Sequence, residues 1–327
     1  MLAVDGSALQ IPTDKNDTES FYPNAPNKES YNLLHINAMY DLLRHVYTDA
    51  IVQKGRVRDE DQALIDMVDR AANCPAIVLA DRGYESYNVF AHIQEKGWRY
   101  LIRIKDYESN VGITQGLDLP DQDEYDVPVN LLVTRSQNKE AKKFAANRNK
   151  YKIFYRNQKL DFLPSKVTAS DPLKFYAFSF RIVRFKISDS IFETVITNPP
   201  EKLKQLYAMR WGIETSFRLL KHTIGLLHFH AKKAELIFQE IFSRLIMYNF
   251  TELLVTLADI QQNGRIYAYQ VNFSMAAHIC RKFLSGDMPP TGIESLIAKF
   301  ISPIRPGRSA PRIHTAKVFK SFSYRMA

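Results

Sequence analysis

The chain has 327 residues, of which 46% are hydrophobic and 12% aromatic; this composition is typical of a folded globular protein and excludes a disordered one. Its two cysteines, Cys74 and Cys280, exclude a disulfide framework and indicate a reducing compartment. There is no run of about 18 uncharged apolar residues and no signal-peptide pattern at the start, so we expect a cytoplasmic protein without a membrane span.

The net charge of +9 is unevenly distributed along the chain. Residues 135–186 carry 14 basic and 3 acidic residues, whereas residues 299–327 carry 7 basic residues and no acid. Clustered basic charge is typical of proteins that bind a polyanion, most simply a nucleic acid. A solubilising basic face is the alternative interpretation.

The N-terminal region is expected to consist of strands. Residues 2–12 predict two short strands joined at Asp5-Gly6, which places Asp5 at the end of the first strand. An Asp before Gly is most often a turn former, and this alternative stays open. Residues 32–43 and 45–55 are rich in β-branched and aromatic side chains and predict two further strands.

A parallel strand–helix–strand unit is expected next. Residues 76–80 are uninterruptedly apolar, as in a strand buried on both faces, and Asp81 follows directly. A helix over residues 87–97 and a strand over residues 99–105 complete the unit. Such units gather functional residues at the carboxyl ends of their strands, so Asp81 is a candidate site residue. A helix cap or an ion pair within its loop is the alternative.

The helical pattern disappears between residues 106 and 197, which predicts a β-rich segment. Strands are expected at residues 152–158, 174–188 and 191–198. Within the second strand, Arg181, Arg184 and Lys186 alternate with apolar residues, a pattern suited to stacking on bases and to phosphate contacts. An edge strand with protective cations is the alternative.

The most informative stretch is one helix expected over residues 199–225. At about 100° per residue, Tyr207, Arg210, Glu214 and Lys221 fall within about 60° of one another, along the border of an apolar stripe. An ordinary ion pair between Arg210 and Glu214 on a solvated helix edge is the alternative. The border therefore holds one carboxylate between two cations on a face that packs against the rest of the protein.

The remainder of the chain predicts a long helix and a basic tail. Residues 231–262 form an amphipathic pattern able to cover the apolar stripe of the preceding helix. The proline-rich, basic C-terminal end predicts an extended tail that lies on the domain or on DNA. His228 and His230 have no third ligand near them in the sequence, and we interpret them as surface or core residues.

Three carboxylates, those of Asp5, Asp81 and Glu214, share one pattern. Two are expected at strand ends of one sheet and the third on a helix that packs against it. Clustered carboxylates repel one another unless cations neutralise them, and their hard oxygen atoms suit Mg²⁺ or Mn²⁺. Two such ions can support in-line phosphoryl transfer, a reaction that matches a partner that is a phosphodiester polymer.

The sequence resembles the insertion-sequence-four family of DDE transposases over nearly its whole length. The motifs that carry the resemblance are Asp5-Gly6-Ser7, Asp81-Arg82-Gly83-Tyr84-Glu85-Ser86 and the spacing Tyr207-x2-Arg210-x3-Glu214-x6-Lys221. The last spacing corresponds to the Tyr-Arg-Glu-Lys signature of that family. Arg210-Trp211 and the segment ISPIRPGR are also similar to it.

The resemblance implies an α/β fold: a ribonuclease-H-like catalytic core, with a mixed sheet flanked by helices and a β-rich insertion between the second Asp and the Glu. The expected parts are residues 1–105 and 198–262 for the core, 106–197 for the insertion, and 263–327 for a C-terminal helical segment and basic tail. It also implies that Asp5, Asp81 and Glu214 hold two divalent metal ions, Mg²⁺ or Mn²⁺. Tyr207, Arg210 and Lys221 are then expected to contact phosphates of the transposon end.

The implied activity is cut-and-paste transposition on double-stranded DNA. Its steps are strand cleavage, formation of a hairpin at the transposon end and strand transfer. The resemblance further implies a homodimer in the DNA complex, no membrane, and a prokaryotic cytoplasmic protein associated with the nucleoid when bound to DNA.

One feature departs from the family pattern. Members usually carry an N-terminal helical domain before the first catalytic Asp, whereas Asp5 lies four residues from Met1. We therefore expect that the reader of the terminal repeats is missing. Two alternatives stay open: a non-catalytic DNA-binding or inhibitory derivative of a transposase, and a DDE nuclease repurposed for another task.

Overall fold

The computed structural model describes residues 1–23, 29–105, 112–164, 173–188, 191–198, 203–262, 264, 266–288 and 291–304. Its strands are β1 (Leu2–Ile11), β2 (Phe21–Tyr22), β3 (Tyr31–Asp41), β4 (Val46–Lys54), β5 (Ile77–Ala80), β6 (Arg99–Arg103), β7 (Tyr125–Thr134), β8 (Tyr151–Ile153), β9 (Phe175–Ser188), β10 (Ile191–Thr197), β11 (Tyr269–Val271) and β12 (Ile301–Pro303). Its helices are α1 (Glu60–Arg70), α2 (Tyr87–Glu95), α3 (Lys139–Phe144), α4 (Leu203–Met209), α5 (Trp211–Leu219), α6 (Ala234–Leu257), α7 (Phe273–Leu284) and α8 (Ile293–Ala298), with single turns η1 (Arg82–Tyr84) and η2 (Leu220–Ile224).

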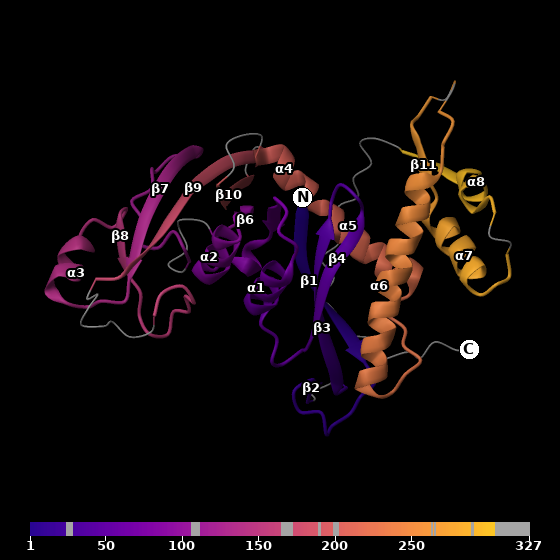
Figure 1. Cartoon of the computed structure of the whole chain (residues 1–327), viewed down its shortest axis with the longest axis horizontal. Helices are drawn as coiled ribbons and strands as arrows, with labels where there is room; N and C mark the ends of the chain where they lie inside the picture. Colours follow the sequence, from indigo (N-terminus) through magenta and orange to yellow (C-terminus); the bar gives the residue numbers. More distant parts are fainter. Residues whose placement is uncertain are drawn as a thin grey trace.

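One mixed sheet forms the centre of the molecule and carries helices on both faces (Figure 1). The strand order is β2-β3-β1-β5-β6-β10-β9-β7-β8, and β4 pairs with β3. Strand β1 is antiparallel to β3 but parallel to β5, and β5 is parallel to β6. The carboxyl ends of β1, β5 and β6 therefore point to the same edge of the sheet.

The alternation of side chains along β1 assigns the two faces of the sheet. Val4 belongs to the core that α1 and α2 cover, whereas Ala3 and Leu9 belong to the core that α5 and α6 cover. Both cores are closed by buried apolar side chains of the helices, which confirms the predicted mixed α/β class. A smaller third core joins α7 and α8 to α6.

The prediction of two short strands in residues 2–12 is wrong, because β1 runs unbroken from Leu2 to Ile11. Asp5-Gly6 is therefore no turn, and Asp5 lies inside the strand. Gly6 pairs with Asn37, and a Cβ atom at Gly6 would lie 2.5 Å from Nε2 of His35. Glycine is thus needed here for close packing of β3 on β1 and not for a chain reversal.

The single helix expected over residues 199–225 is divided in three. Helix α4 ends before Arg210, α5 follows, and η2 widens into a π-helical turn. The helix ends at Gly225, as expected, and this glycine has a φ of 95°, the left-handed conformation common at helix ends. The prolines at positions 199 and 200, expected to begin the helix, lie outside the described residues.

The middle third of the chain extends the central sheet. Strand β10 pairs with β6, and β9, β7 and β8 continue outward from it (Figure 1). Strands β9 and β10 lie where the sequence predicts them, whereas β8 is shorter than expected and β7 was not predicted. The short helix α3 also lies in a stretch where no helix was expected, capped by the side chain of Asn138.

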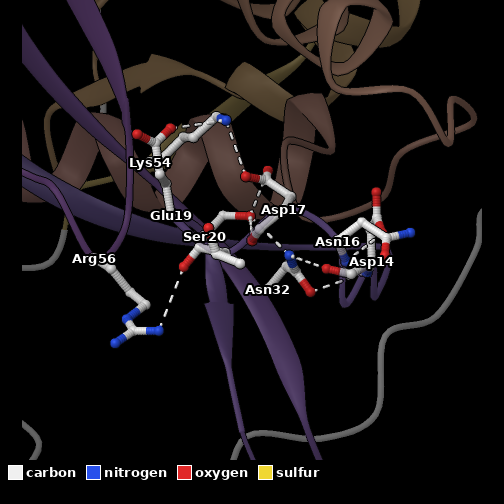
Figure 2. Close-up of polar contacts among 9 residues, drawn as sticks. Asp14, Asn16, Asp17, Glu19, Ser20, Asn32, Lys54 and Arg56 are labelled. Atoms are coloured by element: carbon white, nitrogen blue, oxygen red, sulfur yellow. Dashed lines mark hydrogen bonds and ion pairs between the residues drawn. The ribbon is translucent and has the colours of Figure 1, made fainter.

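A set of polar side chains fixes the loop between β1 and β3 (Figure 2). We call it the Asn32 clamp; its members are Asp14, Asp17, Ser20, Asn32 and Lys54. The amide of Asn32 donates to the Ser20 hydroxyl and to the Asp14 carbonyl, and it accepts from the Asp14 N–H. The ammonium of Lys54 lies 2.9 Å from Asp17. The fully buried Asn32 and Ser20 are therefore hydrogen-bonded, as buried polar groups require.

The predicted long helix after residue 231 is present as α6 and packs Ile237, Ile241 and Tyr248 into the core. Among the described residues no helix is long and apolar enough to cross a membrane. Most of the predicted basic tail, residues 305–327, lies outside the described part of the chain.

Candidate active site

The register of two parallel strands brings the first two aspartates together. Val4 on β1 pairs with Ala80 on β5, so Asp5 and Asp81 occupy the next position on adjacent strands. Asp81 lies directly after β5, as predicted, whereas Asp5 continues within β1. Alternation along the strands places both on the face covered by α5.

Asp5 is the least compensated of the three carboxylates. Burial, together with the nearby charges of Glu214 and Asp81, raises the pKa of its carboxyl to about 6. The Gly6 N–H, 2.8 Å from Asp5 Oδ1, and the guanidinium of Arg210 act in the opposite direction. The pKa of Asp5 is thus high because the folded chain gathers negative charge in a partly desolvated place.

Asp81 has two stabilising neighbours. Its side chain caps the turn η1 by accepting from the Arg82 N–H at 2.7 Å. The guanidinium of Arg103 lies 3.7 Å from it, and the same guanidinium contacts Glu193 on β10. The expected alternative of a helix cap is therefore present together with an ion pair, but the partner is Arg103.

Helices α4 and α5 bring Tyr207, Arg210 and Glu214 to the same face of the sheet. Arg210 is only 5% exposed, lies 3.0 Å from Glu214 and stacks over the Tyr207 ring at 5.5 Å. Burial raises the pKa of Tyr207 to about 12. Within the described residues, the Tyr207 hydroxyl and Arg210 Nε have no hydrogen-bond partner although both atoms are buried.

Lys221 joins the site from the π-helical turn. Its ammonium donates a hydrogen bond to the Ser7 hydroxyl. Ser7 lies two residues after Asp5 on β1, and residues two apart on a strand point to the same face. Lys221 therefore contacts the strand that carries Asp5. The other three members of the predicted border contact each other, because Arg210 touches both Tyr207 and Glu214.

A hollow of about 560 Å³ opens beside Asp5 and Asp81. Its lining residues are Asp5, Gly6, Glu60, Asp81, Arg82, Gly83, Tyr84 and Lys105. Glu60 is held 3.0 Å from the buried His35 behind Gly6. The cations Arg82 and Lys105 thus lie next to the aspartates, where an anionic substrate would bind.

Sequence reasoning missed Arg103, Glu193, Glu60 and Lys105. Arg103 ends a parallel strand, the same position that identified Asp81, so this signal could have found it. Glu193 could not be found, because nothing in the sequence shows that β10 pairs with β6.

Two of the three cations of β9, Arg181 and Arg184, are engaged within the protein, and the third, Lys186, is held through its backbone. Arg181 forms a two-pronged ion pair with Asp126 on β7, and Arg184 lies 5.1 Å over the Phe192 ring. The backbone N–H of Lys186 donates to Glu124. The acidic residues that precede the basic segment therefore offset part of its charge, which charge counting along the sequence did not reveal.

The described part of the chain contains no set of three acidic, His or Cys side chains already converged for a metal ion. The donor chemistry nevertheless fits one. The carboxylates of Asp5, Asp81 and Glu214 share a face, and the charges of Asp81 and Glu214 both raise the pKa of Asp5. Oxygen donors of this kind are those that Mg²⁺ and Mn²⁺ prefer.

Comparison with known proteins agrees with this geometry. No curated protein sequence matches the chain. The protein family described as the transposase DDE domain matches residues 1–250, a stretch that includes all three carboxylates. The family implies DNA as the substrate and a transposase type of catalytic function. The chain therefore belongs to the transposase DDE domain family.

Proposed function

We propose that the chain cleaves and rejoins DNA strands with two divalent cations, Mg²⁺ or Mn²⁺, held by Asp5, Asp81 and Glu214. The observation that carries the proposal is the partly buried carboxylate of Asp5, beside Asp81 and on the face that carries Glu214; burial and these two acids raise its pKa to about 6. Such a group is stabilised either by a proton or by a bound cation. A cation is the partner that preserves the negative oxygens at neutral pH.

The buried donors support binding of a phosphodiester. Tyr207 and Arg210 each have a polar atom without a partner among the described residues, and leaving a buried donor unsatisfied is costly. Phosphate oxygens accept from hydroxyl and guanidinium groups, so a DNA backbone placed here would satisfy both. Lys221 would supply a further donor from the same face.

The bound ions would activate a water or 3′-hydroxyl and stabilise the leaving oxygen. The residues of the chain have the positioning tasks. Arg210 turns its free edge to the phosphate while it keeps Glu214 in place, and Tyr207 fixes the plane of the guanidinium by stacking. Lys221 approaches along β1 on the Ser7 side.

The strand arrangement supports a ribonuclease-H-like core as the finer fold. The antiparallel strands β4, β3 and β1 continue into the parallel strands β5 and β6, with helices on both faces. In this proposal residues 1–105 and 198–262 form the core, residues 106–197 form an insertion that extends its sheet, and residues 263–327 form the C-terminal segment.

Finer features of the activity rest on the sequence motifs. The Tyr207-x2-Arg210-x3-Glu214-x6-Lys221 spacing supports membership of the insertion-sequence-four family and its steps of cleavage, hairpin formation and strand transfer. Joining two DNA ends supports a homodimer in the DNA complex. A prokaryotic cytoplasmic protein that associates with the nucleoid completes the proposal.

The test is nicking of supercoiled DNA with Mg²⁺ or Mn²⁺. Glu214→Gln should reduce metal-dependent nicking to background and keep DNA affinity similar or higher, because it removes a metal ligand and one negative charge. The matched control is Glu235→Gln, an exposed glutamate in the first turn of α6, which should nick like the parent chain. Equal nicking by Glu214→Gln and the parent chain would reduce Glu214 to a structural partner of Arg210.

A second candidate function is non-catalytic DNA binding. It is favoured by the ion pairs of Asp81 with Arg103 and of Glu214 with Arg210, which hold two of the carboxylates away from a converged metal site. The same assay separates the candidates, since a binder shows salt-sensitive DNA affinity without nicking in either metal.

A further inference from the structure

Arg103 is shared between two carboxylates from different parts of the chain. Its guanidinium contacts Glu193 on β10 through Nε and approaches Asp81 to 3.7 Å through one terminal nitrogen. The Glu193 side chain is 12% exposed, whereas those of Arg103 and Asp81 are 31% and 37% exposed. The anchored end of the arginine is therefore the buried one, and the end at Asp81 is the looser and more solvated one.

The sheet register explains this arrangement. Val195 pairs with Arg103, and Glu193 lies two residues from Val195 on the same face as Leu101 and Asp81. Because β10 is antiparallel to β6, its glutamate reaches the end of β6 where Arg103 stands. The strand that closes the middle third of the chain onto the core thus delivers an acid to the active-site face.

We propose that Arg103, anchored by Glu193, is the resident counter-cation of Asp81 and withdraws toward Glu193 when a divalent cation binds. The inference rests on the proposed metal-dependent function. Without a divalent cation the guanidinium offsets the charge of Asp81, as an opposite charge within about 4–6 Å does. A metal ion at Asp81 and a guanidinium beside it repel each other, so Arg103 opposes binding there and Glu193 provides its alternative partner.

Arg103 is thus a positioning residue that regulates occupation of the site. It keeps Asp81 ordered before the metal arrives, and the contact with Glu193 limits how far it moves afterwards. A purely structural ion pair would instead stabilise the fold without any opposing effect on cation binding.

The experiment measures Mn²⁺ affinity of the full DNA-free chain by calorimetry and by the electron paramagnetic resonance signal of free Mn²⁺. Arg103→Gln should bind Mn²⁺ about tenfold more tightly, the lower end of the effect that a neighbouring cation has on a carboxylate. Arg103→Lys retains the charge and should bind like the parent chain. The matched control is Arg99→Gln, an exposed arginine at the opposite end of β6, which should leave the affinity unchanged.

Glu193→Gln provides the second variant and should act in the opposite direction. With Glu193 neutral, Asp81 becomes the main partner of Arg103, so Mn²⁺ binding should weaken. In a double-mutant cycle the effect of Glu193→Gln should shrink in the Arg103→Gln background, because the glutamate acts through the arginine. Circular dichroism and thermal melting establish that each variant is folded.

Unchanged or weaker Mn²⁺ binding by folded Arg103→Gln overturns the inference. If that variant does not fold, tighter or unchanged binding by Glu193→Gln overturns it instead. Asp81→Asn distinguishes this failure from failure of the proposed function: Mn²⁺ binding that is the same in Asp81→Asn and the parent chain shows that Asp81 holds no metal at all.

Discussion

The Asn32 clamp, in the loop after β1, and the Asp5 site, which includes β1 itself, both gather acids, but they compensate the charge differently. In the clamp, burial is outweighed by hydrogen bonds from Ser20 and Lys54, which hold the pKa of Asp17 below its ordinary value. At the site, burial and neighbouring acids raise the pKa of Asp5 to about 6. The clamp is complete without a ligand, whereas in the proposed function the site becomes complete only with one.

This difference separates a structural polar cluster from a functional one. Polar groups that fix a loop are satisfied by each other, because an unsatisfied buried group costs stability. Groups that await a substrate or cation carry that cost in the free protein, which is why perturbed pKa values gather at functional sites. The contrast predicts opposite responses to substitution in the two regions.

The largest effect on stability is expected for Asn32→Ala. Asn32 is fully buried and makes three hydrogen bonds to Asp14 and Ser20, and its removal deletes all three. The free energy of unfolding should fall by about 3 kcal/mol, measured by urea denaturation. Asn16→Ala, at an exposed position of the same loop, should change it by less than about 0.5 kcal/mol. Equal effects of the two variants would show that the clamp does not fix the loop.

The second prediction is that Asp5→Asn stabilises the metal-free protein at high pH. A carboxyl whose folded pKa lies above its unfolded value costs stability as the pH rises from about 4 toward 6, and the full cost persists above that pH. The substitution should therefore raise the unfolding free energy by about 2 kcal/mol at pH 8 and have little effect at pH 4. The control is Asp121→Asn, an exposed carboxylate.

Destabilisation by Asp5→Asn at pH 8 would contradict the comparison, because it would place Asp5 with the satisfied acids of the clamp. The same variant should also lose metal-dependent nicking, so that stability and activity change in opposite directions.

These responses depend on features that the sequence reveals unevenly. The apolar run before Asp81 identified a buried parallel strand and its functional end, and the helical spacing of Tyr207, Arg210 and Glu214 identified one face. The position of Asp5 within its strand was missed, because Asp-Gly is a strong turn signal unless a partner strand needs the glycine. That need arises from His35 on β3. Packing between strands cannot be deduced from the residues next to Gly6 in the sequence.

Pairings between distant segments were also beyond prediction. Arg103 and Glu193 meet because β10 joins β6, and Arg181 meets Asp126 because β9 joins β7. Charge counted along the sequence treats such acids and bases as separate segments. The effective basic surface is therefore smaller than the sequence indicates.

A smaller effect is expected for Lys54→Met. Lys54 contacts both Asp17 and Glu19, but its side chain is about one-third exposed, and ion pairs in that setting contribute less than about 1 kcal/mol. The lowered pKa of Asp17 means that this contribution is present at neutral pH and is lost as the pH falls through that pKa. Unfolding free energies of parent and variant should thus differ at pH 7 and converge in acid; a constant difference would contradict the assignment.

The smallest expected effect is on DNA binding and concerns the Arg181–Asp126 pair. This pair is charge-balanced, like the clamp, but it is partly open to solvent, like the Asp5 site. Asp126→Asn should release Arg181 for a phosphate and make the salt dependence of DNA binding steeper by about 0.9 in the log–log slope. Fluorescence anisotropy over a salt series measures it. Asp121→Asn is the control, and an equal slope in both variants would exclude Arg181 from the DNA interface.

The central claim is that Asp5, Asp81 and Glu214 form one metal site. The most direct measurement is an anomalous difference map from crystals of the chain that contain Mn²⁺. We predict manganese in contact with Asp5 and Asp81 on the face that carries Glu214. Crystals that bind manganese elsewhere, or none at this face at millimolar Mn²⁺, would contradict the claim.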